Sequence, residues 1–331
     1  HPDLEANTWI NTEELNGVEG YDDDGNGYID DIRGWDFINI DNAPLDDNMH
    51  GTHVAGIAGA VGNNGIGIAG AAWNVKLMHI KVFQSTGQGN SVTISDGIEY
   101  AYTNGATVIN MSFASGNESL TMRLALENAY ATSILVAASG NSGIIIGPYG
   151  GFPFFPAAYS FVLGVEANAS WSNFDDHPYY TMYSFLYNYE LVAPGANIIS
   201  TVPNGGYASL NGTSMAAPLV AGALALYKEH KQEDSKELMF GNLINTAGVP
   251  YVDMLAAIEV EPEPRLAIIT HSKEDDINEQ NNNGYFEPGE TIEILPLIKN
   301  YWGPTEDVRV GIEFAEFEDQ TKATIIQDEI Q

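Results

Sequence analysis

The sequence predicts an α/β protein built on a doubly wound parallel sheet, and three observations support this fold class. Through about residue 258, short β-rich runs alternate with helix-like stretches, the order expected of a parallel sheet covered by helices on both faces. Residues 259–265, EVEPEPR, are acidic and proline-containing and indicate a linker. Residues 266–331 alternate without a helical period, which indicates an incomplete β-sandwich-like module.

The elements of the first domain, residues 1–258, follow from their composition. The expected strands are KLMHIKVF at 76–83, ATVINMSF at 106–113, SILVAAS at 133–139, FVLGVEA at 161–167 and ELVAPGANIIST at 190–201. The expected helices are HGTHVAGIAGAVG at 50–62, SVTISDGIEYAYTNG at 91–105, SLTMRLALENAYA at 119–131 and TSMAAPLVAGALALYKEH at 213–230. In this fold class, ligands bind beyond the carboxyl ends of the strands, so we expect the functional residues there.

Composition limits the function classes. The 331 residues carry 12 Lys+Arg against 45 Asp+Glu, a net charge of -33, and such a polyanion repels nucleic acid. The charge suits solubility or cation binding, and no apolar run is long enough to predict a membrane span. The chain has no cysteine, so disulfides and thiolate metal sites are excluded. Bound Ca²⁺ is one alternative source of stability.

The strongest motif is NGTSMAAP at 211–218, in which Ser214 follows a glycine and opens a long apolar helix. The free N–H groups and the dipole at a helix start favour negative charge, which suits a nucleophile that develops charge nearby. An ordinary helix cap is the alternative interpretation, because Ser and Thr are common at such positions.

A second motif, MHGTHVAG at 49–56, places His50 at the start of another small-residue helix. Histidine is the usual general base for a serine nucleophile because it titrates near neutrality. The pair His50 and His53 also suggests a metal site, but the glutamate of an HExxH motif is absent, so zinc is disfavoured. We expect His53 to be a packed structural residue.

A third motif, ASGNSG at 138–143, follows an expected strand directly. Asn141 at that strand's carboxyl end can direct an amide N–H at a developing oxyanion. The alternative is a plain asparagine-glycine turn.

The blocks HGTHVAG, AASGNSG and GTSMAAP, in this order, resemble the subtilisin-like serine proteases, the subtilases, over about residues 1–258. The resemblance implies that His50 is the general base and Ser214 the nucleophile. Asn141 and the Ser214 backbone N–H would bind the oxyanion. It further implies a secreted, extracellular serine endopeptidase that is monomeric and acts on protein or peptide substrates.

The resemblance places the third triad residue, an aspartate, at the end of a strand just upstream of an HPDL segment. This chain begins with that segment, His1-Pro2-Asp3-Leu4, so we expect the triad aspartate, a signal peptide and a propeptide upstream of residue 1. Residues 1–331 alone should then be inactive and poorly folded. Asp3 is expected to be a Ca²⁺ ligand and not a triad member.

Substrate-binding residues are implied by the same resemblance. Ser112, Phe113 and Ala114 match an edge segment that pairs with an extended substrate backbone, although the family commonly has Gly-Gly at 114–115. Ser139 and Gly140 are expected beside them. Phe154 is expected at the floor of the specificity pocket, where relatives often have glycine. A local misalignment within GPYGGFPFFP at 147–156 is the alternative.

Cation sites are predicted in acidic and asparagine-rich loops. DDDGNGYIDD at 22–31 has the D-x-D-x-N-G spacing of an EF-hand-type loop, but position 12 is Arg33, so no complete EF-hand is present. The expected Ca²⁺ ligands are Asp22, Asp24 and Asn26, with Asp30 or Asp31 as a late carboxylate. A solvated acidic turn is the alternative.

Two further Ca²⁺ sites are expected. The resemblance implies that Asp3 binds one Ca²⁺ together with three residues of the loop at 61–68: Asn64, Ile66 and Ile68. A third possible group of Ca²⁺ ligands lies in the C-terminal module: Asp276, Asn278, Asn281, Asn283 and Glu290. The alternative interpretation of this segment is a plain polar loop.

Two functions from different classes remain open. One is an active endopeptidase, and the other is an inactive subtilase-derived adhesion or binding protein. The residue at the aspartate position upstream of His1 distinguishes them. An α/β-hydrolase lipase or esterase is excluded by chain order, because that fold places its serine before its histidine.

Overall fold

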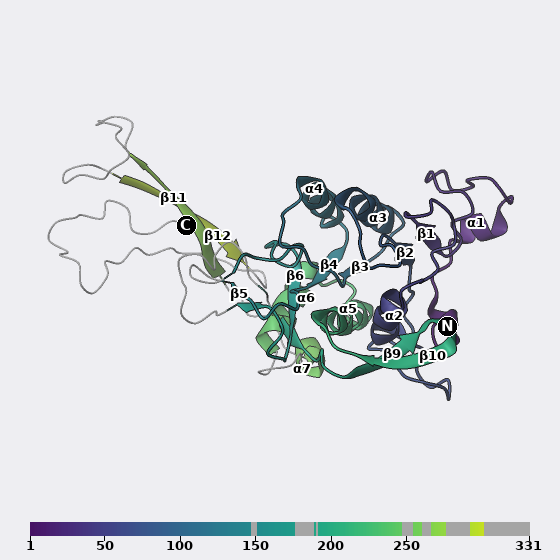
Figure 1. Ribbon diagram of the computed structural model, residues 1–331. Helices are drawn as coiled ribbons and strands as arrows, with labels where there is room; N and C mark the ends of the chain where they lie inside the picture. Colours follow the sequence, from purple (N-terminus) through teal and green to yellow (C-terminus); the bar gives the residue numbers. More distant parts are fainter. Residues whose placement is uncertain are drawn as a thin grey trace. The chain divides into compact units, whose positions relative to one another are not determined.

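The computed structural model describes residues 1–146, 151–175, 189, 191–246, 254–259, 266–275 and 292–300. The chain forms two compact units, His1–Val260 and Glu261–Gln331 (Figure 1). Of the predicted linker at 259–265, the described residues include only Glu259, which ends helix α7 (Met254–Glu259). Within the described residues, no helix combines the length and apolar character needed to cross a bilayer.

The first unit is organised around a parallel sheet, as predicted. Its strands lie in the order β3-β4-β6-β8, and each neighbouring pair is parallel. The bounds are β3 (Val108–Met111), β4 (Ile134–Ala138), β6 (Leu163–Ala167) and β8 (Leu191–Ala193). Strands β4 and β6 are buried at every position, which a parallel sheet covered on both faces requires.

Alternate residues of β4 enter two separate cores. Leu135 and Ala137 pack with α3 (Ser91–Thr103) and α4 (Leu120–Ala129). Val136 and Ala138 pack with α5 (Thr213–His230) on the opposite face. Because successive side chains of a strand point to opposite faces, this split confirms the doubly wound arrangement (Figure 1).

The N-terminal part contains a small second sheet. Strand β1 (Gly34–Asp36) pairs in parallel with β2 (His79–Lys81). Among the described residues, β2 pairs with β1 and β3 pairs with β4, and no strand joins β2 to β3. Short helices precede this sheet at η1 (Glu5–Asn7) and α1 (Thr12–Asn16).

Helix α2 (His50–Gly59) packs against α5 and against the antiparallel hairpin of β9 (Ile198–Val202) and β10 (Gly206–Leu210), which the short turn η2 (Pro203–Gly205) joins. The prediction of a single strand at 190–201 was wrong, because this segment forms two strands, β8 and β9. Pro194 and Gly195 separate the two strands, because proline cannot donate a ladder hydrogen bond and glycine weakens a strand interior. The remaining described elements are β5 (Ile145–Ile146), β7 (Phe174–Asp175) and α6 (Lys236–Thr246).

The second unit contains two long strands. β11 (Leu266–Asp275) pairs antiparallel with β12 (Ile292–Asn300), and the register shifts between Ile268 and Thr270. These two strands are the described part of the predicted β-module. The predicted cation site between Asp276 and Glu290 lies outside the described residues.

Candidate active site

Ser214 is the second residue of α5, and it lies against the segment that follows β3. Its hydroxyl donates to the Ser112 carbonyl oxygen at 3.1 Å, and the Ser112 hydroxyl donates to the Ser214 carbonyl oxygen at 2.8 Å. Asn110 in turn donates its amide to the Ser112 hydroxyl at 2.9 Å. These bonds fix the start of the helix against the carboxyl end of the strand.

Asn141 lies three residues after β4 and reaches the same helix start. Its Oδ1 accepts the Thr213 backbone N–H at 2.8 Å and the Thr213 hydroxyl at 3.0 Å. With Oδ1 occupied in this way, the amide Nδ2 is the end of the side chain that remains free to act as a donor toward a bound substrate. Asn141 is solvent-exposed, so that donor is accessible.

Gly140 makes this arrangement possible. Its φ is +102°, which disfavours other residues, and a Cβ there would lie 2.4 Å from the Asn173 amide nitrogen. Its own N–H donates to the Thr213 hydroxyl at 3.1 Å. The turn after β4 is thereby fixed to α5 on both sides of the Gly140-Asn141 bond.

A pocket of about 240 Å³ lies where these segments meet. It is lined by Phe113, Ala114, Ala138, Gly140, Asn141, Ser142, Phe154, Thr213 and Ser214. The pocket therefore brings together five residues of three distant motifs that were predicted for catalysis or substrate binding: Phe113, Ala114, Gly140, Asn141 and Ser214. Phe154 lines the same cavity. Ser139 does not line it, because its side chain is fully buried and its hydroxyl donates to the Asn173 carbonyl oxygen at 2.9 Å.

Phe154 enters the pocket from a segment paired with the chain after β3. The next residue, Phe155, exchanges two backbone hydrogen bonds of 2.8 Å with Ser115. The Phe154 ring lies close to two glycines: a Cβ would be 3.3 Å from it at Gly140 and 3.9 Å from it at Gly116. The aromatic ring thus occupies space that the neighbouring glycines leave open.

His50 is the first residue of α2 and is half-buried. Burial lowers its pKa below the usual value, the negative charge of Asp46 opposes that shift, and His53 adds to it. The imidazole is therefore a neutral base at neutral pH. Helix α2 approaches α5 closely, since a Cβ on Gly222 would lie 2.5 Å from the Ala58 carbonyl oxygen.

His53, one turn further along, is fully buried. Its Nε2 lies 3.1 Å from the carbonyl oxygens of both Ile198 and Ala208, on the two strands of the hairpin. Carbonyl oxygens only accept, so Nε2 carries the hydrogen and bridges both strands. His53 is thus packed against the hairpin, as expected, while its buried Nδ1 has no hydrogen-bond partner among the described residues.

The acidic loop brings together a different carboxylate set from the predicted one. Oxygens of Glu14, Asp24 and Asp31 lie within 4.8 Å of one another, and Glu14 and Asp31 are buried. Among the described residues, none of the three forms an ion pair with Lys or Arg. Asn26 lies beside them, donating its amide to Asp24 at 2.9 Å and to Asp31 at 3.0 Å.

Asp22 and Asp30, both predicted ligands, lie outside this carboxylate group. Asp22 accepts the backbone N–H groups of Asn26 and Gly27, and Asp30 accepts that of Gly20. Backbone N–H groups of the loop also bind within the carboxylate group: Glu14 accepts those of Asp23, Asp24 and Asp30, and Asp24 accepts that of Asn26. The sequence did not place Glu14 beside this loop, because Glu14 belongs to a separate short helix, α1, with no spacing rule that relates it to the loop.

At the second predicted cation site, residues of the loop at 61–68 donate hydrogen bonds to Asp3. The Asp3 carboxylate is fully buried and accepts the Asn64 amide at 2.6 Å and the Ile68 N–H at 2.8 Å. Ile66 donates its N–H to the Asn64 side chain at 3.1 Å. Tyr207, which the sequence did not indicate, donates its hydroxyl to Asp3 at 3.2 Å.

Fold and site together define a doubly wound α/β protein with a serine and a histidine at two helix starts and an asparagine at a strand's carboxyl end. The chain belongs to the subtilase family: the family described as Peptidase_S8, Subtilase family, matches residues 1–285.

Among similar proteins is Subtilisin-like protease 1 of Plasmodium falciparum (isolate 3D7), 38% identical over 243 residues, which cover 68% of this chain and 35% of that protein. Subtilisin Savinase of Lederbergia lenta is 40% identical over 218 residues, covering 65% of this chain and 77% of its own length. A solved protease structure from Pseudoalteromonas arctica PAMC 21717 has a TM-score of 0.55 at 31% identity, covering 63% of this chain and 70% of that one. The chain thus spans about a third of the Plasmodium protein.

Proposed function

We propose that the protein is a serine endopeptidase that cleaves peptide bonds in protein substrates. The observation that carries the proposal is the shared pocket, in which Ser214 and the Asn141 side chain lie together at the start of α5. Membership of the subtilase family and similarity to proteases support the same reaction class.

In the proposed mechanism, Ser214 Oγ attacks the scissile carbonyl carbon while His50 takes the hydroxyl proton. The resulting oxyanion accepts hydrogen bonds from Asn141 Nδ2 and the Ser214 backbone N–H. His50 then gives the proton to the leaving amine, and water hydrolyses the acyl-enzyme by the same steps. The lowered pKa of His50 keeps it unprotonated and ready to act as a base.

The hydroxyl of Ser214 must turn to react, because in the structure it donates to the Ser112 carbonyl oxygen at 3.1 Å. Catalytic hydrogen bonds in free enzymes often form only when substrate binds. An extended substrate would run along Ser112, Phe113 and Ala114, with its P1 side chain in the pocket beside Phe154.

We assign the third triad member to a strand that pairs between β2 and β3. The sheet topology supports this assignment: among the described strands, β2 pairs with β1 alone and β3 with β4 alone, so no strand joins these two edges. The native upstream segment is expected to supply that strand and its aspartate. Adding this segment to residues 1–331 should produce both cooperative thermal unfolding and peptidase activity, and full activity without it would contradict the assignment.

Calcium is the proposed structural cofactor, and the donor chemistry fits. Glu14, Asp24 and Asp31 offer oxygens, the ligands Ca²⁺ prefers, and their mutual repulsion within 4.8 Å is relieved by a divalent cation. Asp3 and Asn64, with backbone carbonyls of Ile66 and Ile68, are the second proposed set. Ca²⁺ would stabilise these loops and takes no part in peptide cleavage.

We further propose a secreted, monomeric enzyme without a nucleic-acid partner. The resemblance to subtilases supports secretion, and the net charge of -33 supports the absence of phosphate-bearing partners. Cell fractionation and size-exclusion chromatography test location and oligomeric state.

The experiment that tests the function is peptide hydrolysis by the full-length enzyme. Ser214→Ala should abolish turnover, while Ser209→Ala, on exposed β10, should retain it. Equal turnover in both variants would reject the proposed nucleophile. A full-length protein without any hydrolytic activity would favour the binding-protein alternative.

A further inference from the structure

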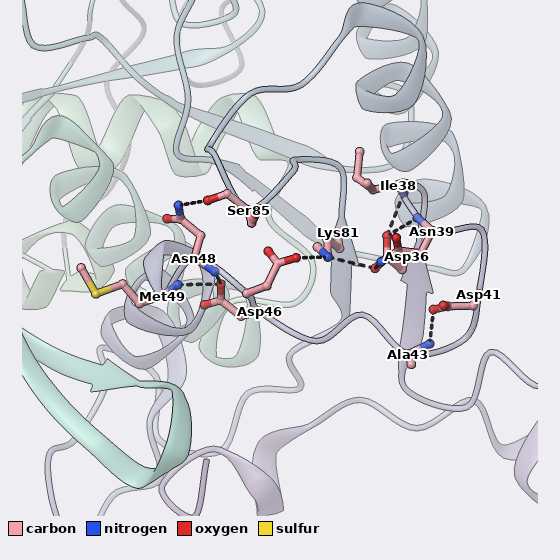
Figure 2. A network of polar contacts seen from close by, with 11 residues as sticks. Asp36, Ile38, Asn39, Asp41, Ala43, Asp46, Asn48, Met49, Lys81 and Ser85 are labelled. Carbon is pink, nitrogen blue, oxygen red and sulfur yellow. Dashed lines mark hydrogen bonds and ion pairs between the residues drawn. The ribbon is translucent and has the colours of Figure 1, made fainter.

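One carboxylate, Asp46, holds the backbone on both sides of His50. Its Oδ1 accepts the N–H groups of Asn48 at 2.9 Å and Met49 at 2.8 Å, just before the histidine. Its Oδ2 accepts the Thr52 N–H at 2.7 Å and the Thr52 hydroxyl at 2.6 Å, just after it. Figure 2 shows the Asp46 side chain directed back at the two N–H groups that precede α2.

The backbone that Asp46 holds is in an unusual conformation. Met49 has φ +88°, in the left-handed region that non-glycine residues rarely adopt. Such a residue keeps this conformation only where its surroundings fix it. The hydrogen bond from the Met49 N–H to Asp46 is one such restraint, and it acts one residue away from the imidazole.

The loop that carries Asp46 is itself anchored at two further points. Lys81 of β2, with a side chain only 11% exposed, lies 2.9 Å from Asp47 and 3.1 Å from the buried Asp36 of β1. Asn48 donates its amide to the Ser85 carbonyl oxygen at 2.7 Å. The start of α2 is therefore attached to the small parallel sheet and to the loop after it (Figure 2).

Within the described residues, burial and the charges of Asp46 and His53 set the pKa of His50. Asp46 favours its protonated form, whereas burial and His53 oppose it. The elements packed against α2 add little: α5 carries no titratable residue before Tyr227, β9 carries none, and β10 carries Tyr207, whose hydroxyl donates to Asp3. Burial alone would raise the pKa of Asp46, but hydrogen bonds from Thr52, Asn48 and Met49 outweigh it and hold that pKa below its usual range. Asp46 therefore stays ionised when His50 accepts a proton.

We propose that Asp46 is a positioning residue for His50, which fixes the backbone around the imidazole and favours its imidazolium form during the reaction. This inference rests on the proposed peptidase function. It assigns Asp46 a role separate from that of the triad aspartate, because no hydrogen bond joins Asp46 to the His50 ring among the described residues.

Asp46→Asn in the full-length enzyme tests the proposal, because it keeps the side-chain shape and removes the charge. We expect kcat to fall about 10- to 100-fold with KM nearly unchanged, since small misplacements of a catalytic group have effects of this size. The acid limb of the kcat/KM profile should move to lower pH, because the charge that raises the His50 pKa is lost. Asp41→Asn is the matched control: Asp41 makes a similar turn, accepting the Ala43 N–H at 3.0 Å, in the same loop.

A pH profile and kcat in Asp46→Asn equal to those of Asp41→Asn would overturn the inference. If Asp46→Asn does not fold, Thr52→Ser and Thr52→Val replace it: Ser keeps the hydroxyl donor to Asp46 and should retain kcat, whereas Val should lower it several-fold. Equal kcat in these two variants would also overturn it.

A second readout is independent of turnover. In a Ser214→Ala background, the His50 ring can be titrated by NMR, with and without Asp46→Asn. The inference predicts a lower His50 pKa in the double variant, and an unchanged pKa would contradict it even if the protein proved not to be a peptidase.

Discussion

The start of α5 and the acidic loop at 22–31 were both predicted from short motifs, but they behave differently in the structure. Around α5, the motif residues Ser214 and Asn141 share one pocket with Gly140. In the acidic loop, Asp24 lies together with Glu14 and Asp31, whereas the predicted ligands Asp22 and Asp30 lie outside that carboxylate group.

The difference lies in what fixes each side chain. A parallel sheet brings the carboxyl ends of its strands and the starts of the following helices to one edge. A residue's position at a strand end or helix start therefore largely determines which residues it lies beside. The side chains that meet in the acidic loop come from several separate segments of the chain. Glu14 comes from α1, and Asn11 and Tyr100 hydrogen-bond to Asp31 from other segments.

The largest expected effect contrasts the two histidines of one helix. His50→Ala should lower kcat about 10⁶-fold, which is the size measured for the catalytic histidine of subtilisin, a member of the same family. His53→Gln should leave kcat within a few-fold. It should instead lower the melting temperature, because the bridge to Ile198 and Ala208 is lost and a buried polar atom costs about 1–3 kcal/mol. Steady-state kinetics measures kcat in both variants, and calorimetry measures their melting temperatures. A larger loss of kcat in His53→Gln than in His50→Ala would exchange the roles of the two histidines.

The next effect concerns Asn141. Replacing it by Leu removes the amide donor and should lower kcat about 10²- to 10³-fold with little change in KM, again the magnitude known from subtilisin. Asn141→Asp keeps an acceptor for Thr213 but not the donor, so it should lose activity as well. Undiminished kcat in either variant would remove the oxyanion assignment.

Sequence analysis predicted the doubly wound fold and the motifs that supply Ser214 and Asn141 to one pocket, because both depend on short-range pattern. The continuous apolar run of β4, which is buried at every position, and the small-residue helix starts are visible in the sequence. The division of 190–201 into β8 and β9 was missed although Pro194 and Gly195 stand between them. Contacts such as Tyr207 with Asp3 were not predictable, because 204 residues separate the partners and no spacing rule links them.

Calcium removal should lower thermal stability moderately. Variants of the acidic loop then distinguish the carboxylate group seen in the structure from the ligand set predicted from spacing. Ca²⁺ at about 100 times Kd stabilises by about 2.7 kcal/mol per site. Chelation should therefore lower the melting temperature by several degrees, at about 2–4 °C per kcal/mol for a domain of this size. Glu14→Gln and Asp24→Asn should each remove part of the Ca²⁺-dependent shift, whereas Asp22→Asn should remove less. Loss of the shift in Asp22→Asn alone would favour the set predicted from spacing.

The smallest expected effect is on specificity. With Phe154 in the pocket, small P1 side chains such as Ala or Val should be preferred over Phe. Phe154→Gly should raise kcat/KM for Phe and Leu at P1 by about 10-fold or more, since each apolar group accommodated in a pocket contributes about 1–3 kcal/mol. A P1 profile unchanged by this substitution would place Phe154 outside the P1 site.

The central claim, that Ser214 is an activated nucleophile, is tested most directly by covalent labelling of the full-length protein. Treatment with a fluorophosphonate followed by peptide mass spectrometry should place a single adduct on Ser214. Labelling should disappear in His50→Ala and persist in His53→Gln. An adduct on another residue, or no adduct on a folded protein that hydrolyses peptides, would contradict the account.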